Sequence, residues 1–378
     1  MHLGFISSEY PCEHYPKTGG LGTSIKNLAM ALISQKIKVS VFIVGTDENR
    51  VFQENGVKIH LIKRKRVPFL TWYITRKHYQ NYINSIVEKD KITALEAPDW
   101  TGITAFMKFK VPLVIRLNGS DRYFCHLDGR KQKFKNFFFE RNALKNADHI
   151  ISVSAFTADV TKKIFGLSNE MTIIHNSIDI EKFTPMSIEN DQNTILYFGT
   201  IIRKKGVLEL AKAFNVASAK NHQIKLKLIG KNTPDVFTNT STLELFMKNL
   251  NEEAKQRVMH IPEVPYEEVR RQIAEASLIV LPSFAEAFPM TWLEAMSMEK
   301  PLITSDIGWA KEMMIHKETG YMVDPKNTGD FAEAILTVFE NMNDAKQMGE
   351  NARKRVENEF STKKILKDNI AYYERISS

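Results

Sequence analysis

Cysteine is scarce in this chain: Cys12 and Cys125 are the only two among its 378 residues. Two thiols in a protein of this length favour reduced, chemically inert side chains over a disulfide or a metal site. The longest mainly apolar stretches, such as residues 39–45, are about seven residues long, whereas a membrane-spanning helix needs about 20. We therefore expect a protein that does not cross a bilayer.

The first residues of the sequence contain neither a basic leader nor a long apolar segment, so we expect no signal peptide and a cytoplasmic location. Apolar residues make up 43% and charged residues 25% of the chain, a balance typical of folded proteins. No short repeat and no low-complexity tract is evident. At 378 residues, the chain is long enough for two domains of about 150–200 residues each.

Positive charge is concentrated in the first half of the chain. Residues 1–185 carry 27 Lys and Arg against 17 Asp and Glu, whereas residues 186–378 carry 25 against 27. Much of the excess lies in segments 63–78 and 129–145, where Lys and Arg are mixed with large aromatic residues. This composition fits a solvated face whose aromatics point inward, an anionic membrane surface, or nucleic acid. Because no nucleic-acid-binding motif accompanies it, we expect no nucleic-acid partner.

Short β-branched runs alternate with amphipathic segments along the whole chain, which predicts parallel sheets covered by helices on both faces. Helical segments are expected at 23–35, 207–218 and 266–276, and the chain after 326 is expected to be mainly helical. Predicted strands lie at 2–7, 39–44, 57–62, 92–97, 111–117, 149–154, 172–176, 194–199, 224–230, 278–283 and 301–306.

The alternation of predicted strands and helices is interrupted once by a polar segment and then begins again. This predicts two doubly wound α/β domains of Rossmann type that face an interdomain cleft. We place the boundary in the polar stretch 183–193, giving domains of 1–185 and 186–360. The last helix, about 361–378, is a candidate to pack back onto the first domain.

A glycine-rich segment, KTGGLGTS at 17–24, follows the first predicted strand and precedes a helix. Gly19, Gly20 and Gly22 would let backbone N–H groups approach a phosphate closely. The G-G-x-G spacing differs from that of the dinucleotide-binding fingerprint. The segment is thus either a ligand loop or an ordinary turn.

A second strand–turn–helix segment, FGTIIRKKGVLEL at 198–210, places Arg203, Lys204 and Lys205 after the carboxyl end of a strand. Cations at this position can offset the charge of a diphosphate, above all as that charge grows during bond breaking. The alternative interpretation is a solvated loop.

The most informative segment is LPSFAEAFPMTWLEAMSMEKP at 281–301. Pro289 suits the first position of a helix that continues through Trp292 and Glu294. The first-turn amides of such a helix form an anion site, with Glu286 in the preceding loop and Glu294 inside the helix. Two carboxylates flanking this site can hold hydroxyls on either side of a bound phosphate. The residues expected at the anion site are Phe288, Pro289, Met290 and Thr291.

These segments, taken together, resemble the family-4 retaining glycosyltransferases of GT-B fold. The resemblance runs along almost the whole chain, and the two-glutamate motif is its most specific part. The matching segments are GGLG (19–22), EAPDWTG (96–102), NADHIISVSAFT (146–157), HNSIDIEKF (175–183), FGTIIRKKG (198–206), the motif at 286–294, and ETGYMVDP (318–325).

The resemblance implies transfer of a hexose-type sugar from a nucleotide-diphosphate sugar to a glycan or lipid-linked acceptor. It implies retention of the anomeric configuration and no requirement for a metal or other cofactor. By the same resemblance, Glu286 contacts the donor sugar, Glu294 the ribose, and Lys205, with Arg203, the diphosphate. The glycine loop of the first domain closes over the phosphates. Such enzymes build surface polysaccharides and glycoconjugates, which is compatible with a peripheral position at the inner face of the membrane.

Two positions depart from the family pattern. Thr200 stands where many relatives have Arg, and Asn118 stands where relatives often have His. Asn can form a hydrogen bond but cannot carry a charge, so we assign no general base. Weaker candidates for acceptor contacts are Glu96, Asp99, Asn118, Asp121 and His126.

Two other functions stay open at this point. The first is a non-catalytic GT-B protein that binds a nucleotide sugar or serves as a scaffold. The second is an epimerase or phosphorylase of the same architecture. The intact pair of glutamates with Lys205 favours the transferase.

Overall fold

The computed structural model describes residues 1–15, 19–188 and 192–377, which form two compact units. Unit 1 consists of Met1–Asn176 and Thr362–Ser378, and unit 2 of Ser177–Ser361. The division after residue 176 precedes the one expected after 185, and part of the expected linker, residues 189–191, lies outside the described residues. One reason for the earlier division is that Phe183 is buried and packs against Tyr266 of unit 2.

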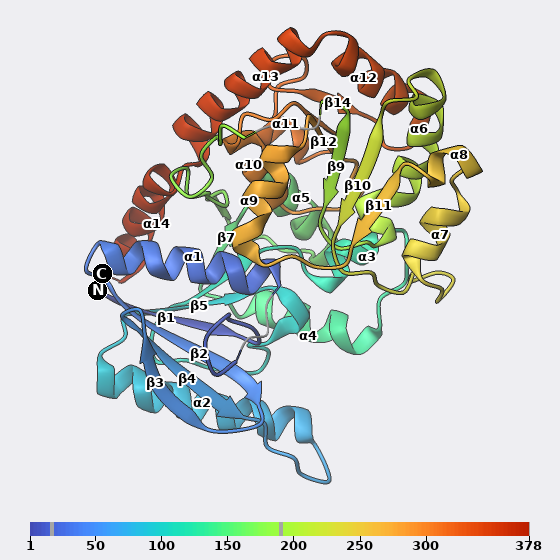
Figure 1. Cartoon of the computed structure of the whole chain (residues 1–378). Helices are drawn as coiled ribbons and strands as arrows, with labels where there is room; N and C mark the ends of the chain where they lie inside the picture. The colour runs from blue at the N-terminus through green and yellow to red at the C-terminus, as the bar shows by residue number, and fades with distance from the viewer. Residues whose placement is uncertain (16–18, 189–191, 378) are drawn as a thin grey trace. The chain divides into compact units, whose positions relative to one another are not determined.

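Unit 1 is built on an eight-stranded sheet in the order β3-β4-β2-β1-β5-β6-β7-β8, parallel except for the pairing of β3 with β4 (Figure 1). Its central strands are buried on both faces and consist mostly of apolar residues, as expected for a covered parallel sheet. The strands are β1 (His2–Ser7), β2 (Lys38–Thr46), β3 (Arg50–Glu54), β4 (Val57–Lys63), β5 (Ala94–Pro98), β6 (Leu113–Leu117), β7 (His149–Ser152) and β8 (Thr172–Ile173).

Helices cover both faces of this sheet. One apolar cluster joins the sheet to α1 and to the C-terminal helix α14, and a second joins the sheet to α2, α4 and α5. The helices of unit 1 are α1 (Gly20–Ser34), α2 (Thr71–Asp90), α3 (Asp121–Leu127), α4 (Phe134–Lys145), α5 (Ala155–Phe165) and α14 (Thr362–Ser377), with a 3-10 turn η1 at Trp100–Gly102.

Unit 2 contains a fully parallel six-stranded sheet in the order β11-β10-β9-β12-β13-β14. Its strands are β9 (Thr194–Phe198), β10 (Lys225–Ile229), β11 (Val258–Ile261), β12 (Leu278–Leu281), β13 (Leu302–Ser305) and β14 (Tyr321–Val323). Its helices are α6 (Val207–Lys220), α7 (Thr242–Lys248), α8 (Glu252–Lys255), α9 (Tyr266–Glu275), α10 (Met290–Ser297), α11 (Ala310–Met313), α12 (Thr328–Glu340) and α13 (Met342–Arg355), with a 3-10 turn η2 at Arg203–Lys205 and a π-helical turn η3 at Val356–Phe360.

All eleven strands expected from the sequence are present, and the described ranges contain three further strands, β3, β11 and β14, that were not expected. β3 pairs antiparallel with β4 across Asn55 and Gly56, which both have positive φ (49° and 82°). An Asn-Gly pair is a strong hairpin signal because both turn residues must adopt the left-handed region. The missed β11 and β14 lie at the two edges of the sheet of unit 2 and are only partly buried, so they lack the continuous apolar run of a central strand.

No helix within the described ranges combines the length and apolar character that spanning a membrane requires.

Candidate functional site

The switch point of unit 2 lies between β9 and β12, which are neighbours in the sheet although four α-helices (α6 to α9) and two strands separate them in the chain. The strand order reverses here, and ligands of doubly wound sheets bind beyond the carboxyl ends of the strands at such a point. Lys205 lies in η2 shortly after β9, and Glu286 lies in the loop after β12. The topology thus brings together two side chains that are 81 positions apart.

Close backbone packing holds these two loops together. Gly206 has a φ of +71°, and a Cβ atom there would lie 1.9 Å from the carbonyl oxygen of Pro282. The Phe284 N–H donates to the Lys204 carbonyl over 2.8 Å. Glycine is required at 206 because any side chain would need both a left-handed conformation and space that Pro282 occupies.

Lys205 and Glu286 form an ion pair between Nζ and Oε1. Their side chains are only 20% and 11% exposed, so water screens the two charges weakly. Each group fixes the position of the other: the ammonium group holds the carboxylate of the loop after β12, and the carboxylate orients the long lysine side chain.

Arg203, the second expected diphosphate contact, is already bound to an acidic partner. Its Nε and Nη2 atoms donate to the two carboxylate oxygens of Asp235 over 2.6 and 3.0 Å, and its guanidinium group lies 5.4 Å from the Phe237 ring centre. Hydrogen bonding to Arg203 holds the pKa of Asp235 well below its usual value. Asp235 therefore compensates much of the charge of Arg203, which makes Arg203 a weaker candidate than Lys205.

Glu294 is buried inside α10, and its Oε1 accepts a hydrogen bond from the Tyr266 hydroxyl over 3.0 Å. Burial raises the pKa of Glu294 to about 7, although the Tyr266 hydroxyl and the nearby Lys182 act in the opposite direction. The Lys182 ammonium lies 4.5 Å from the centre of the Tyr266 ring. Tyr266 and Lys182 thus support the charged form of a carboxylate that burial disfavours.

The start of α10 differs slightly from the sequence prediction. The helix begins at Met290, and Pro289 is its N-cap with an extended conformation (φ −71°, ψ 123°) instead of its first residue. Proline suits this position because it has no N–H to satisfy. Phe288 and Pro289 are buried, with Phe288 packed against Phe360, whereas Met290 and Thr291 are partly exposed. Met290 and Thr291 are therefore the solvent-accessible residues at the start of the helix.

The glycine-rich segment of unit 1 is not the loop that was expected. Gly19 is the N-cap of α1, and Gly20 and Gly22 lie within its first turn, while residues 17 and 18 are outside the described part of the chain. The Gly22 N–H donates to Oε1 of Glu9 over 3.2 Å. A carboxylate therefore already interacts with one of the amides expected to meet a phosphate. Gly20 differs, since its Cβ would meet no atom within 4 Å among the described residues outside its own helix backbone and immediate chain neighbours.

Glu96, expected to contact an acceptor, is instead part of a buried network. Arg116 donates to both of its carboxylate oxygens, over 2.7 and 3.0 Å, and also to Asn369 and Tyr373 of α14. The Tyr373 hydroxyl donates to Glu96 as well. Because every oxygen of the carboxylate is occupied inside the core, we assign Glu96 a structural role that anchors α14.

Asp99 likewise lies below the surface, fully buried at the end of β5. Its Oδ1 accepts the Asn118 N–H over 3.0 Å, while Oδ2 has no hydrogen-bond partner among the described residues. Burial raises the pKa of Asp99 to about 8. Asp99 therefore shapes the turn at Asn118, whose partly exposed side chain is the better candidate for a substrate contact.

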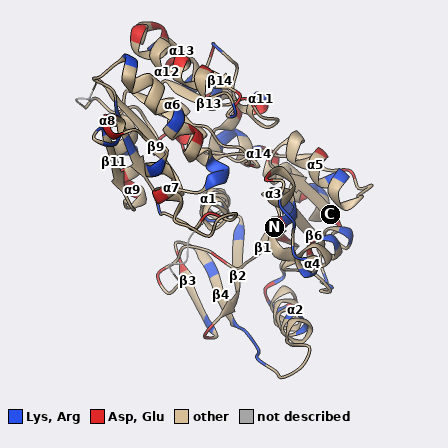
Figure 2. Ribbon diagram, turned by 90° about the vertical axis from the view of Figure 1, so that its right-hand side faces the viewer, with Lys and Arg blue, Asp and Glu red and all other residues tan. Residues whose placement is uncertain are grey.

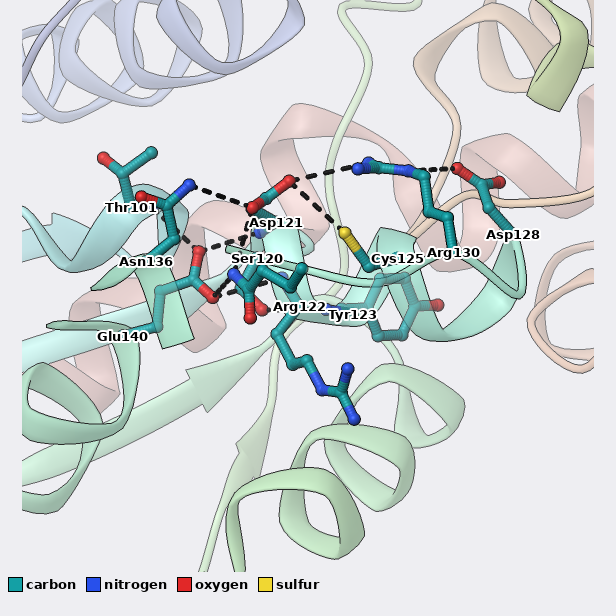
Figure 3. Close-up of polar contacts among 11 residues, drawn as sticks. Thr101, Ser120, Asp121, Arg122, Tyr123, Cys125, Asp128, Arg130, Asn136 and Glu140 are labelled. Carbon is teal, nitrogen blue, oxygen red and sulfur yellow. Dashed lines mark hydrogen bonds and ion pairs between the residues drawn. The ribbon is translucent and has the colours of Figure 1, made fainter. Parts of the chain in front are cut away.

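A polar cluster around Asp121 occupies the start of α3 (Figure 3). Asn136 and Gln132 donate to Asp121, and Arg130 lies 3.5 Å from it. Burial raises the pKa of Asp121, but these neighbours outweigh burial and hold it below its usual value. The buried Glu140 accepts the backbone N–H groups of residues 101, 121 and 122. The Asp121 carboxylate is thus saturated by the fold, which argues against the acceptor contact expected for it.

His126, the last of these candidates, is exposed near the end of α3. In the described part of the chain, no group of three or more His, Cys, Asp or Glu side chains is arranged to hold a metal ion.

Family models match both halves of the chain. The model described as "Glycosyltransferase Family 4" matches residues 18–182, and the model described as "Glycosyl transferases group 1" matches residues 179–355. The chain belongs to glycosyltransferase family 4. This family-4 protein is 26% identical to an uncharacterized glycosyltransferase of Methanocaldococcus jannaschii over 97% of each chain. It is 26% identical to the capsular polysaccharide biosynthesis glycosyltransferase CapM of Staphylococcus aureus over 64% of this chain and 65% of CapM.

Solved structures show the same fold. Sucrose-phosphate synthase from Thermosynechococcus elongatus superimposes with a TM-score of 0.80 at 19% identity, covering 99% of both chains. HepE from Anabaena, in complex with UDP-glucose, gives a TM-score of 0.76 at 16% identity and covers 99% of this chain and 100% of that one. The family-4 protein therefore has the GT-B fold.

Several side chains of this family-4 glycosyltransferase were missed by the sequence analysis. Glu9 and Glu140 gave no signal, because their partners are backbone N–H groups brought near by folding. Tyr266 was visible at the start of a predicted helix, but nothing linked it to Glu294. Trp100 is part of the EAPDWTG segment, and its 39% exposure at the carboxyl end of β5 marks it as a surface on which a sugar ring can pack.

Proposed function

We propose that the protein transfers a hexose-type sugar from a nucleotide-diphosphate sugar to a hydroxyl of a glycan or lipid-linked acceptor, in the synthesis of a surface polysaccharide or glycoconjugate. The observation that carries the proposal is the Lys205–Glu286 pair at the switch point of unit 2. A cation beside a carboxylate suits a ligand that joins phosphates to sugar hydroxyls. The UDP-glucose bound by HepE and the capsular role in the name of CapM support the substrate classes.

We assign the donor contacts as follows. Lys205 binds the diphosphate, and Glu286 binds the hydroxyls of the donor sugar. When the donor binds, these contacts replace the ion pair between the two side chains. Glu294 accepts hydrogen bonds from the ribose. The partly exposed start of α10, at Met290 and Thr291, presents backbone N–H groups to the phosphates.

The proposed reaction needs no metal. As the glycosidic bond weakens, negative charge moves onto the diphosphate, and Lys205 stabilises that charge. Arg203 contributes less, because Asp235 already compensates the charge of its guanidinium group. The acceptor hydroxyl attacks from the face that the leaving group occupies, and the anomeric configuration is retained. Gly20, whose Cβ position is open, is the proposed phosphate contact of unit 1.

For the acceptor we propose contacts with Asn118, Trp100 and His126, the candidates of unit 1 that are at least partly exposed and whose polar groups are not saturated as those of Asp121 are. We propose a cytoplasmic protein at the inner face of the membrane, where a lipid-linked acceptor is available. The two free and buried cysteines agree with a reducing compartment.

The test is release of nucleoside diphosphate from UDP-, GDP- and ADP-sugars, first without and then with candidate acceptors. A transferase is expected to release the nucleotide slowly from one donor class without acceptor, and to retain this activity in EDTA. NMR of the transferred product is expected to show the donor's anomeric configuration. No release from any donor would favour the non-catalytic alternative, whereas loss of activity in EDTA or an inverted product would refute only the metal-free or retaining part.

A further inference from the structure

Unit 1 exposes large apolar side chains at two helix starts. Phe69 and Leu70 precede α2 and are 83% and 61% exposed, while Phe134 and Phe138 of α4 are 79% and 47% exposed. Side chains of this size normally avoid water, and a group of them on one surface marks an interaction site. Leu70, the N-cap of α2, has a φ of +52°, a left-handed conformation that is uncommon for residues other than glycine.

An aromatic chain connects the two helix starts. Trp72 of α2 lies 5.2 Å from Phe139 of α4 and 5.3 Å from Phe106, and Phe106 lies 5.6 Å from Phe138. The buried parts of this chain fix α2 against α4. These contacts connect the exposed Tyr73 at the start of α2, through Trp72 and Phe106, with the exposed Phe138 and Phe134 of α4. We define the docking patch as Phe69, Leu70, Tyr73, Ile74, Phe134 and Phe138.

The surroundings of the docking patch are strongly cationic. Residues 63–87 contain no Asp or Glu, and the only acidic residue within 129–145 is the buried Glu140. Figure 2 shows Lys and Arg on the loop between β4 and α2. The exposed cations next to the patch in the chain are Lys63, Arg64, Lys65, Arg66, Lys131, Lys133 and Lys135.

We propose that the docking patch inserts into an anionic phospholipid membrane, with its side chains among the lipids and the surrounding cations on the headgroup phosphates. Leu70 and Ile74 distinguish this partner from nucleic acid, because aliphatic side chains do not stack on bases. A second copy of the chain is disfavoured, since two such cationic surfaces repel each other. The proposal rests on the proposed function and extends it, because it names the surface that contacts the membrane containing a lipid-linked acceptor. Vesicle binding is measured without donor or acceptor, so it tests this surface separately from the transfer reaction.

The experiment is flotation of the full chain with vesicles of phosphatidylcholine alone or with 30 mol% phosphatidylglycerol. We expect binding only to the anionic vesicles, weakening as salt rises. Phe69→Ser with Phe134→Ser is expected to lower the partition coefficient at least tenfold, because burial of one large apolar side chain is worth about that factor. Arg64→Ser with Lys65→Ser is expected to lower it severalfold.

Matched controls lie in unit 2. Val216→Ser with Met259→Ser removes two apolar side chains that are 43% and 58% exposed, and Lys220→Ser with Lys248→Ser removes two exposed cations. All four control residues lie outside the docking patch, so binding is expected to stay at the wild-type level. Circular dichroism and donor hydrolysis show that each variant remains folded.

Three results would overturn the proposal: no binding of the wild type to anionic vesicles, equal binding by the Phe69/Phe134 variant, or an equal loss in the unit 2 controls. Binding of single-stranded DNA without vesicle binding would assign the surface to nucleic acid. Self-association in gel filtration that the Phe69/Phe134 variant abolishes, again without vesicle binding, would assign it to a second copy. None of these results would affect donor hydrolysis, so the proposed function is tested separately.

Discussion

Removal of the Tyr266 hydroxyl is expected to change how donor use depends on pH. Glu294 has a pKa of about 7 because it is buried, and the Tyr266 hydroxyl stabilises its charged form over 3.0 Å. A hydrogen bond to a charged group contributes about 1.5–3 kcal/mol, and 1.36 kcal/mol corresponds to a tenfold change in proton affinity. In Tyr266→Phe, the pKa of Glu294 should therefore rise by about one to two pH units.

The consequence follows if ionised Glu294 is the form that binds the ribose. In the wild type, kcat/KM for the donor should rise with pH through about 7. With a midpoint near pH 8, only about a tenth of Tyr266→Phe molecules would be ionised at pH 7, so kcat/KM should fall about fivefold there. Activity should return toward the wild-type value above about pH 9.

The assay is the initial rate of nucleotide release at subsaturating donor between pH 5.5 and 9.5. Phenylalanine keeps the ring that packs against Phe183 and lies below Lys182. Tyr321→Phe, on the edge strand β14, removes another tyrosine hydroxyl from unit 2 as a control. A midpoint that does not move, or a loss of activity that is the same at every pH, would refute the reasoning.

The other predictions concern catalysis and stability. Lys205→Ala and Glu286→Ala should each lower transfer at least about 100-fold while the melting temperature stays within a few degrees; wild-type rates in both would disprove the site. The pKa of Asp99 is about 8 in the folded chain and 3.8 in the unfolded chain. Between pH 5 and 7 the unfolded chain has therefore lost a proton that the folded chain keeps. As the pH rises through this range, the free energy of unfolding should fall by up to about 1.4 kcal/mol per pH unit. Asp99→Asn should flatten this slope in urea titrations, and equal slopes would contradict a protonated Asp99. Arg116→Met should cost about 3–5 kcal/mol in urea, because it leaves Glu96 buried and uncompensated, and the double variant with Glu96→Gln should recover part of that loss; a cost below about 1 kcal/mol would argue against the network.

Much of the fold was predictable because the signals are local. The mainly apolar runs that became β1, β9 and β12 are short and bounded by polar or glycine residues, and parallel strands buried on both faces are mostly apolar. The hairpin at Asn55 and Gly56 has an equally local signal, the Asn-Gly pair itself, although the alternation of strands and helices does not reveal it.

The donor side of the site was partly predictable for the same reason. Lys205 and Glu286 each follow a predicted strand, and the carboxyl ends of parallel strands share one edge of the sheet. Their direct pairing depends on the packing of Gly206 against Pro282, which no spacing in the sequence encodes.

The sequence by itself determined the two-domain α/β architecture, the cationic character of the first half, and the segments that meet at the carboxyl edges of the strands. Only the tertiary structure decided which charged side chains remain free for a ligand. A carboxylate such as Glu96 has the same local sequence signal whether it faces a substrate or an arginine, because its partner comes from a distant strand. Burial and pairing depend on contacts between remote segments, and these exist only after the chain has folded.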